Sequence, residues 1–125
     1  MYNKKVPVRL DCGLHLFKEL LTGKWKTMLL YYIYSGHKRP SELQRMIADA
    51  DRRVLDKQLG DLVAHGLISK TVYQGLPLKV EYELTNLGKT LEPVIISMDL
   101  WGEEHRGEIE KNIKTKLNTN RNSQD

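Results

Sequence analysis

The chain has 125 residues, of which 40% are hydrophobic and 29% are charged, and it carries a formal net charge of +4. This length and composition are typical of one globular domain and exclude a mainly disordered chain. The single cysteine, Cys12, excludes a disulfide within the chain. Because we find no signal peptide and no apolar run of roughly 20 residues, the sequence predicts a cytoplasmic protein without a membrane partner. The mild excess of positive charge is compatible with an anionic partner.

The first half of the chain predicts a series of helices, because apolar residues recur there at spacings of three and four positions. We expect helices over 13–21, 24–34 and 40–47, and a fourth that starts after Asp51 and ends at Gly66. Pro40 suits a first helical position, and Asp51 suits an N-cap. In the last two helices we expect these apolar side chains to be buried: Leu43, Met46, Ile47, Leu55, Leu59 and Leu62.

After Gly66 the apolar period changes to alternation, which predicts two strands over 67–73 and 78–84. The intervening residues 74–77 read as a hairpin turn. Thr85 can cap a last long helix over 86–112, in which Pro93 is expected to cause a kink. The rest of the chain, 113–125, is polar and is expected to be a disordered tail.

This order of elements predicts a mainly α (α+β) fold, a winged helix-turn-helix with a two-stranded β-wing. We divide the chain into a basic N-terminal arm (1–10), the winged helix-turn-helix domain with its C-terminal dimerisation helix (11–112) and the tail (113–125). The first and last helices leave apolar surface that a symmetric homodimer would bury. The candidate interface residues are Leu14, Phe17, Ile96, Leu100 and Trp101.

The second helix of such a motif enters the major groove of double-stranded DNA with its N-terminal residues toward the base edges. The candidates for base contacts are Arg52, Arg53, Asp56 and Lys57. Arginine matches guanine, and aspartate can accept from cytosine. The candidates for backbone and wing contacts are Lys24, Lys26, Lys38, Arg39, Ser41, Lys70 and Lys79. The alternative for each of these side chains is an ordinary solvated charge on an exposed surface.

Three stretches resemble the HxlR-type winged helix-turn-helix regulators, relatives of the MarR group. "CGLHLFKELLTGKW" (12–25) resembles their opening, and "RPSELQRMI" followed by "RVLDKQLGDLVAHGLI" resembles their helix-turn-helix. "LPLKVEYELTNLGKTLEPVI" (76–95) is similar to their wing and the start of the following helix. The resemblance implies a dimeric bacterial transcriptional regulator, more often a repressor, on an inverted-repeat operator. Pro40 and Gly60 depart from the family, which often has an aromatic and a basic residue there.

The resemblance also implies a sensor, since several members of this family detect oxidants or electrophiles through a cysteine near the N-terminus, the position of Cys12. Lys4, Lys5 and Arg9 are cationic neighbours that favour a thiolate, and so does the start of the first helix. Oxidation would give a Cys12–Cys12 bridge between subunits or a mixed disulfide, and an electrophile would give an adduct. The alternative is an inert residue at the dimer interface.

No pattern in the sequence predicts an enzyme, a metal site or a cofactor. The histidines His15, His37, His65 and His105 lack the spacing of metal ligands. We find no nucleophile–base pair and no phosphate-binding glycine loop. Trp25 and Trp101 are more typical of core positions than of a ligand pocket. The remaining rival to DNA recognition is a winged helix that contacts another protein and has no specific DNA site.

Overall fold

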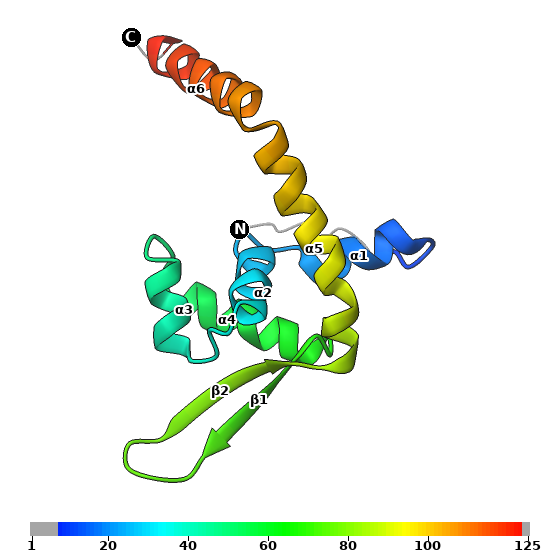
Figure 1. Cartoon of the computed structure of the whole chain (residues 1–125), viewed down its shortest axis with the longest axis vertical. Coiled ribbons are helices and arrows are strands. Elements are labelled where there is room, and N and C mark those ends of the chain that lie inside the picture. The colour runs from blue at the N-terminus through cyan, green and yellow to red at the C-terminus, as the bar shows by residue number, and fades with distance from the viewer. Residues whose placement is uncertain (1–7, 124–125) are drawn as a thin grey trace, which may run out of the picture. The chain divides into compact units, whose positions relative to one another are not determined.

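The computed structural model describes residues 8–123, with side chains to 121, and the chain divides after Glu92 into two compact units. The order of elements is shown in Figure 1. The bounds of the elements are α1 (Gly13–Leu21), α2 (Lys26–Tyr34), α3 (Pro40–Met46), α4 (Arg52–Ala64), β1 (Ile68–Tyr73), β2 (Lys79–Leu84), α5 (Asn86–Glu104) and α6 (Arg106–Ser123). The predicted winged helix-turn-helix is confirmed, and the first helix has the predicted bounds.

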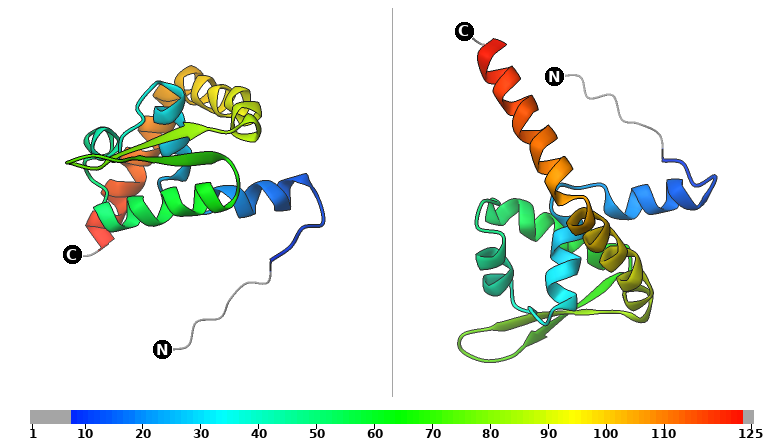
Figure 2. Two further views of the ribbon diagram at one scale, coloured as in Figure 1. Left: turned by 90° about the horizontal axis from the view of Figure 1, so that it is seen from below. Right: turned by 45° about the horizontal axis from the view of Figure 1, so that its top comes forward.

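The core of the first unit lies among α2, α3, α4 and the start of β1. Its fully buried side chains are Leu29, Leu30, Leu43, Leu55, Leu59, Leu62, Leu67 and Ile68. The expected leucine stripe of α4 therefore forms one wall of the core, because residues three and four apart share a helix face. The hairpin of β1 and β2 extends beyond these helices (Figures 1 and 2).

The turn between α3 and α4 is fixed by side-chain hydrogen bonds. Gln44 Nε2 donates to the carbonyl oxygen of Ala50 at 2.9 Å, and the carboxylate of Asp51 accepts from the backbone N–H of Arg53 at 2.7 Å. Asp51 is thus the predicted N-cap of α4. One core expectation is wrong: Met46 is 42% exposed. α3 ends at Met46, where the chain leaves the helix, and the next residue, Ile47, is buried as expected.

The wing is an antiparallel pair in which Lys70 faces Tyr82 and Tyr73 faces Lys79. Each strand starts one residue later than expected, which leaves 74–78 as the connecting loop. Because successive side chains of a strand point to opposite faces, Lys70 and Tyr82 share the face that carries Ile68, and Lys79 shares the other face with the wing glutamates. The wing therefore has one apolar face and one charged face.

The start of α5 is anchored to the first unit through Thr85. Its Oγ1 accepts from the N–H of Gly88 at 3.0 Å, as predicted for an N-cap, and donates to the carbonyl of Gly66 at 2.5 Å. Tyr34 donates its hydroxyl to the carbonyl of Gly88 at 2.8 Å. Burial, with a smaller effect of the Glu92 charge, raises the pKa of Tyr34 to about 12, so the hydroxyl keeps its proton. A Cβ on Gly88 would lie 2.0 Å from the carbonyl oxygen of Leu67, so only glycine fits there.

The second unit differs from the expectation of one helix and a disordered tail. The predicted helix over 86–112 is divided at His105, and α6 runs on to Ser123, so residues 113–123 are helical. Ile109, Ile113 and Leu117 continue an apolar stripe at a spacing of four, which favours the helix despite its polar composition. Pro93 lies inside α5 and does not end it. Residues 124–125 lie outside the described part of the chain.

Candidate nucleic-acid interface

α4 presents its predicted base-contacting residues on two adjacent exposed stripes. Arg53 and Lys57 form one stripe, opposite the buried leucines, and both are exposed. The Lys57 side chain is 78% exposed, and its Nζ lies 3.5 Å from Asp61 Oδ2. Arg53 has no carboxylate partner within residues 8–123. Of the two stripes, this one carries the positive charges that are least restrained by ion pairs.

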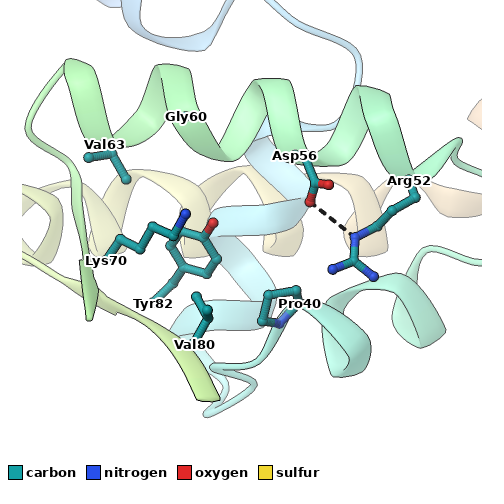
Figure 3. Close-up of a pocket in the computed structure, with 8 residues that line it drawn as sticks. All are labelled: Pro40, Arg52, Asp56, Gly60, Val63, Lys70, Val80 and Tyr82. Atoms are coloured by element: carbon teal, nitrogen blue, oxygen red, sulfur yellow. Dashed lines mark hydrogen bonds and ion pairs between the residues drawn. The ribbon is translucent and has the colours of Figure 1, made fainter. Parts of the chain in front are cut away.

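The second stripe of α4 faces the wing and carries Arg52, Asp56 and Gly60 (Figure 3). Arg52 Nε donates to Asp56 Oδ1 at 3.0 Å, and both side chains are about half exposed. Together with Lys70 and Tyr82 from the wing they border a cavity of about 380 Å³. The ion pair leaves the terminal nitrogens of the arginine directed away from Asp56, as Figure 3 shows.

A basic cleft of about 480 Å³ lies between the start of α3, the start of α4 and the tip of the wing. Its lining residues are Arg39, Pro40, Ser41, Arg52, Pro77, Leu78, Lys79 and Val80. It brings together four residues that the sequence predicts as DNA contacts, from segments far apart in the chain. The lining includes three cations and no carboxylate. A concave surface bordered by cations concentrates counter-ions such as the phosphates of DNA, although each of these three cations is also paired with a carboxylate outside the lining.

The charged face of the wing holds several of these cations in ion pairs. Lys38 Nζ lies 2.9 Å from Glu83 Oε1, and Lys79 Nζ lies 3.6 Å from Glu81 Oε2. Arg39 Nε lies 4.0 Å from the same oxygen of Glu81. The hydrogen bond and charge of Glu83 raise the pKa of Lys38 above its ordinary value. A phosphate must therefore compete with two wing carboxylates for these cations. The sequence interpretation missed both glutamates, although their alternation with Val80, Tyr82 and Leu84 placed them together on this face.

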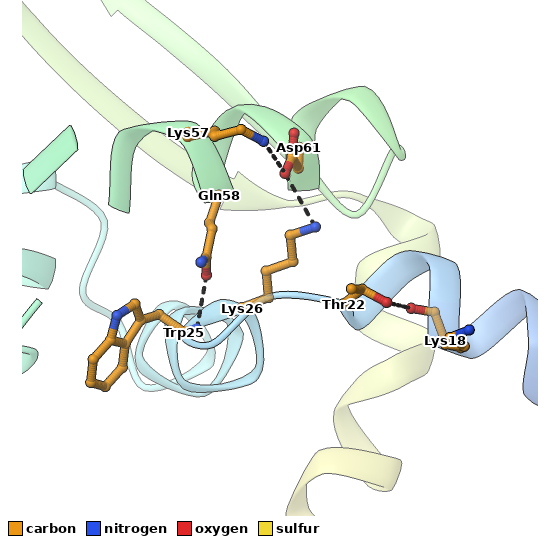
Figure 4. A network of polar contacts seen from close by, with 7 residues as sticks. All are labelled: Lys18, Thr22, Trp25, Lys26, Lys57, Gln58 and Asp61. Carbon is orange, nitrogen blue, oxygen red and sulfur yellow. Dashed lines mark hydrogen bonds and ion pairs between the residues drawn. The ribbon is translucent and has the colours of Figure 1, made fainter. Parts of the chain in front are cut away.

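Lys26 is not a backbone contact, which corrects the prediction for this residue. Only 3% of it is exposed, and its Nζ lies under α4 at 3.2 Å from Asp61 Oδ2 (Figure 4). Burial acts to raise the pKa of Asp61, but the hydrogen bonds and charges of Lys26 and Lys57 outweigh it and hold that pKa below its ordinary value. Beside this pair, Gln58 Oε1 accepts from the backbone N–H of Trp25 at 2.8 Å. Asp61 and Gln58 were also missed by the sequence interpretation.

The two other predicted lysines occupy different places. Lys70 borders the cavity between α4 and the wing, on the apolar face of the hairpin. Lys24 is exposed just before α2, with its Nζ 5.0 Å from the centre of the Trp25 ring, and it lines neither this cavity nor the basic cleft. The structure thus gathers Arg39, Ser41, Arg52 and Lys79 in one cleft and leaves Lys24 apart from it.

Cys12 is exposed and occupies the N-cap position of α1, where its thiol makes no capping hydrogen bond. Arg9, expected to be a cationic neighbour, lies 4.0 Å from Asp11, which offsets its charge. The other expected neighbours, Lys4 and Lys5, lie outside the described residues, as does most of the basic arm. Cys12 thus lies at the start of a helix with its thiol accessible to solvent.

The candidate dimer residues keep apolar surface within each unit. In α1, no residue is buried, Leu14 is 80% exposed and Phe17 is half-buried. In the second unit, Ile96, Leu100 and Trp101 are all exposed. Large apolar side chains that stay exposed on an amphipathic helix are typical of surfaces that contact another protein.

Metal-binding clusters and membrane-spanning helices are both absent from the part of the chain that the structure describes. No group of three or more His, Cys, Asp or Glu residues there is arranged to hold a metal ion. No helix among the same residues has the length and apolar character needed to span a membrane.

Most of the chain is similar to known proteins of one family. The model of the HxlR-like helix-turn-helix family matches residues 20–110. The HTH-type transcriptional regulator YdeP of Bacillus subtilis is 41% identical over 100 residues, covering 80% of this chain and 78% of YdeP. The redox regulator HypR in its reduced form is 38% identical with a TM-score of 0.75, covering 80% of this chain and 99% of that one. Its oxidised form is 40% identical with a TM-score of 0.70, covering 74% and 96%. These relatives are regulators, not enzymes.

Proposed function

The chain belongs to the HxlR-like helix-turn-helix family and is a transcriptional regulator of this type, and we propose that it binds an inverted-repeat operator as a homodimer. Double-stranded DNA is the partner that the family implies. In this proposal the bound dimer acts as a repressor. Arg52, Arg53, Asp56 and Lys57 face the base edges of the major groove, because they lie on the exposed side of the recognition helix.

The observation that carries this proposal is the basic cleft beside the exposed stripe of α4. Arg39, Ser41 and Lys79 meet Arg52 there, although they come from different elements. Phosphate contacts fix the position of a protein on the duplex, and base contacts supply the specificity. A cleft at the start of the recognition helix therefore sets the register from which Arg53 and Lys57 reach the bases.

The homodimer is supported by the exposed apolar residues of α1 and of the second unit. Two copies related by a two-fold axis would present two recognition helices to two half-sites. Successive faces of the major groove are roughly 34–36 Å apart along the duplex, so the half-sites are expected at that spacing or a multiple of it.

We further propose that Cys12 makes the regulator responsive to oxidants or electrophiles. The support is its exposure, its position at the start of α1 and the likeness to HypR, a redox regulator solved in reduced and oxidised forms. In the oxidised dimer two Cys12 thiols lose two protons and two electrons to an oxidant such as diamide and form one S–S bond, while the N=N bond of diamide is reduced to a hydrazine. This bond would change the distance between the recognition helices.

Selection of genomic fragments by the purified, reduced protein tests DNA recognition. Sequencing of the retained fragments is expected to give an enriched inverted repeat. Salt-sensitive retention without a preferred sequence would contradict a specific operator, and no retention at all would favour the rival winged helix that contacts a protein.

A Cys12→Ser variant tests the sensor on the fragment selected in this way. Diamide is expected to release the wild-type protein from DNA and to leave Cys12→Ser bound, because the serine hydroxyl cannot form the bridge. If both proteins are released alike, the sensing role of Cys12 is wrong, whereas DNA recognition stands.

A further inference from the structure

The proposed DNA contacts do not explain the buried lysine under α4. Lys26 is the first residue of α2, and its Nζ lies 3.2 Å from Asp61 Oδ2, the one carboxylate that it pairs with among residues 8–123. A buried ammonium group is costly to desolvate, and an apolar side chain of similar volume often fills such a place with equal or better stability. Packing alone therefore does not account for a charge at this position.

The stem of Lys26 passes close to the turn before α2 and leaves little room for a side chain at residue 23. Gly23 has a φ of +152°, and a Cβ on it would lie 3.1 Å from Cδ and Cε of Lys26 and 3.2 Å from Cδ of Gln58. Gln58, which is also buried, accepts the hydrogen bond of Trp25 N–H at 2.8 Å. Lys26 therefore reaches α4 beside Gln58, with its Nζ on Asp61 (Figure 4). The ion pair is thus a contact of defined geometry between α2 and α4.

Asp61 is shared between this buried lysine and an exposed one. Its Oδ2 lies 3.2 Å from Lys26 Nζ and 3.5 Å from Lys57 Nζ. Lys57 precedes Asp61 by one helical turn and belongs to the proposed base-contacting stripe. Because the charge of Asp61 is already balanced by Lys26, the carboxylate holds Lys57 in position but attracts it less strongly than an unpaired carboxylate would.

We propose that Lys26 and Asp61 are positioning residues for DNA recognition. Asp61 orients Lys57 along α4 in the free protein, and Lys26 neutralises Asp61 so that Lys57 can be transferred to the DNA. When Lys57 leaves for a base or phosphate oxygen, Lys26 stays on Asp61, and no unpaired carboxylate faces the polyanion. This inference rests on the proposed function, because it concerns a residue of the proposed reading face.

The test compares Lys26→Met and Asp61→Asn in the full chain by fluorescence anisotropy, on the genomically selected fragment and on an unrelated duplex. Asp61→Asn releases Lys57 and is expected to tighten binding, whereas Lys26→Met leaves Lys57 with an unshared carboxylate and is expected to weaken it. Each change is expected to reach at most about fivefold in Kd, the equivalent of one exposed salt bridge. Thermal unfolding of the same proteins reports on stability separately.

The stability data distinguish positioning from a structural role. Asp61→Asn strands the buried ammonium of Lys26 and is expected to lower Tm more than Lys26→Met does. A purely structural role predicts that the less stable variant binds DNA more weakly. The positioning role predicts the opposite order, with Asp61→Asn the less stable protein and the tighter binder.

Two controls test whether the effect passes through Lys57. In a Lys57→Ala background, Asp61→Asn is expected to leave Kd unchanged, because no lysine remains to be released. Asp49→Asn, which removes the same charge from the exposed turn before α4, is expected to have a smaller effect than Asp61→Asn. Equal gains from both variants, or an undiminished gain in the Lys57→Ala background, would show a general charge effect and overturn the inference.

The outcome for the wild-type protein separates this inference from the proposed function. If the wild type binds DNA and the two variants shift Kd in the same direction, the positioning role is wrong and the function stands. If the wild type binds neither duplex, the proposed function fails and the positioning role fails with it.

Discussion

The recognition helix and the wing are held in place by very different means, although both border the same basic cleft. α4 has an N-cap at Asp51, a buried leucine stripe and the buried Gln58. The wing is a single pair of strands, and β1 buries only Ile68. The ion pairs on the charged face of the wing involve the exposed lysines Lys38 and Lys79. Few buried contacts and exposed hydrogen bonds are characteristic of low local stability.

This difference suggests a division of labour in recognition. A helix whose backbone is fixed before DNA arrives pays little ordering entropy on binding, so its side chains can discriminate between bases. A wing whose cations are exchangeable between carboxylates and phosphates can adapt to the local path of the backbone. The predictions that follow test each side of this comparison.

The largest effect is expected from removing core volume under α4. Leu59→Ala should lower the free energy of unfolding by about 2–5 kcal/mol, because Leu59 is buried and its loss leaves a cavity. Val72→Ala in the wing should change it by less than about 1 kcal/mol, since Val72 is about half exposed. Urea unfolding measures both variants. Similar losses from both would show that the wing is as firmly packed as α4.

The next effect concerns base reading. Arg53→Ala should cost about 1–3 kcal/mol of binding free energy on the selected operator and relax the preference at one base pair. Lys79→Ala should weaken binding to all sequences alike and reduce the slope of log K against log salt by about 0.9. Titrations on the operator and on single-base variants of it distinguish the two patterns. Sequence-independent weakening by Arg53→Ala would mean that α4 contacts only the backbone.

A smaller effect is expected at the start of α4. Asp51→Ala should lower the free energy of unfolding by about 1 kcal/mol, because the N–H of Arg53 loses the acceptor that lies at 2.7 Å. Asp51→Asn keeps an acceptor oxygen and serves as the matched control, with a loss of only a few tenths. If Asp51→Ala left the stability unchanged, another group would fix the start of α4 and the contrast with the wing would weaken.

The local features of the fold were predictable from sequence, because they depend on neighbouring residues. The N-caps Asp51 and Thr85 and the leucine stripe of α4 all follow from spacing along one element. The alternation around Tyr82 likewise predicted the second strand of the wing and its two faces. These expectations are confirmed by the structure.

Features that depend on a second element were not predictable in the same way. Lys26 shares a helical face with Leu29, Leu30 and Ile33, but α2 carries apolar residues on several faces, and only packing against α4 decides which face is buried. The pairing of Lys38 with Glu83 joins residues from different segments. The polar composition of 113–123 favours disorder, whereas the spacing of its few apolar residues favours the helix that forms.

The smallest effect is expected from Glu83→Gln, which removes the partner of Lys38 on the charged face of the wing. Because both side chains of this pair are exposed and screened by water, the free energy of unfolding should be nearly unchanged. Binding to DNA should tighten by up to about fivefold if Lys38 contacts a phosphate, because the lysine no longer has to leave a carboxylate. The salt slope should stay the same, since the number of neutralised phosphates is unchanged.

Glu19→Gln on α1 makes the same change of charge away from the wing and controls for the net charge of the protein. A tighter complex with Glu83→Gln and not with Glu19→Gln would support exchange of Lys38 between carboxylate and phosphate. Weaker binding by Glu83→Gln would mean that the ion pair persists in the complex and holds the wing in shape. In that case the wing, like α4, would be ordered before DNA arrives, and the specificity of the regulator would depend on both elements.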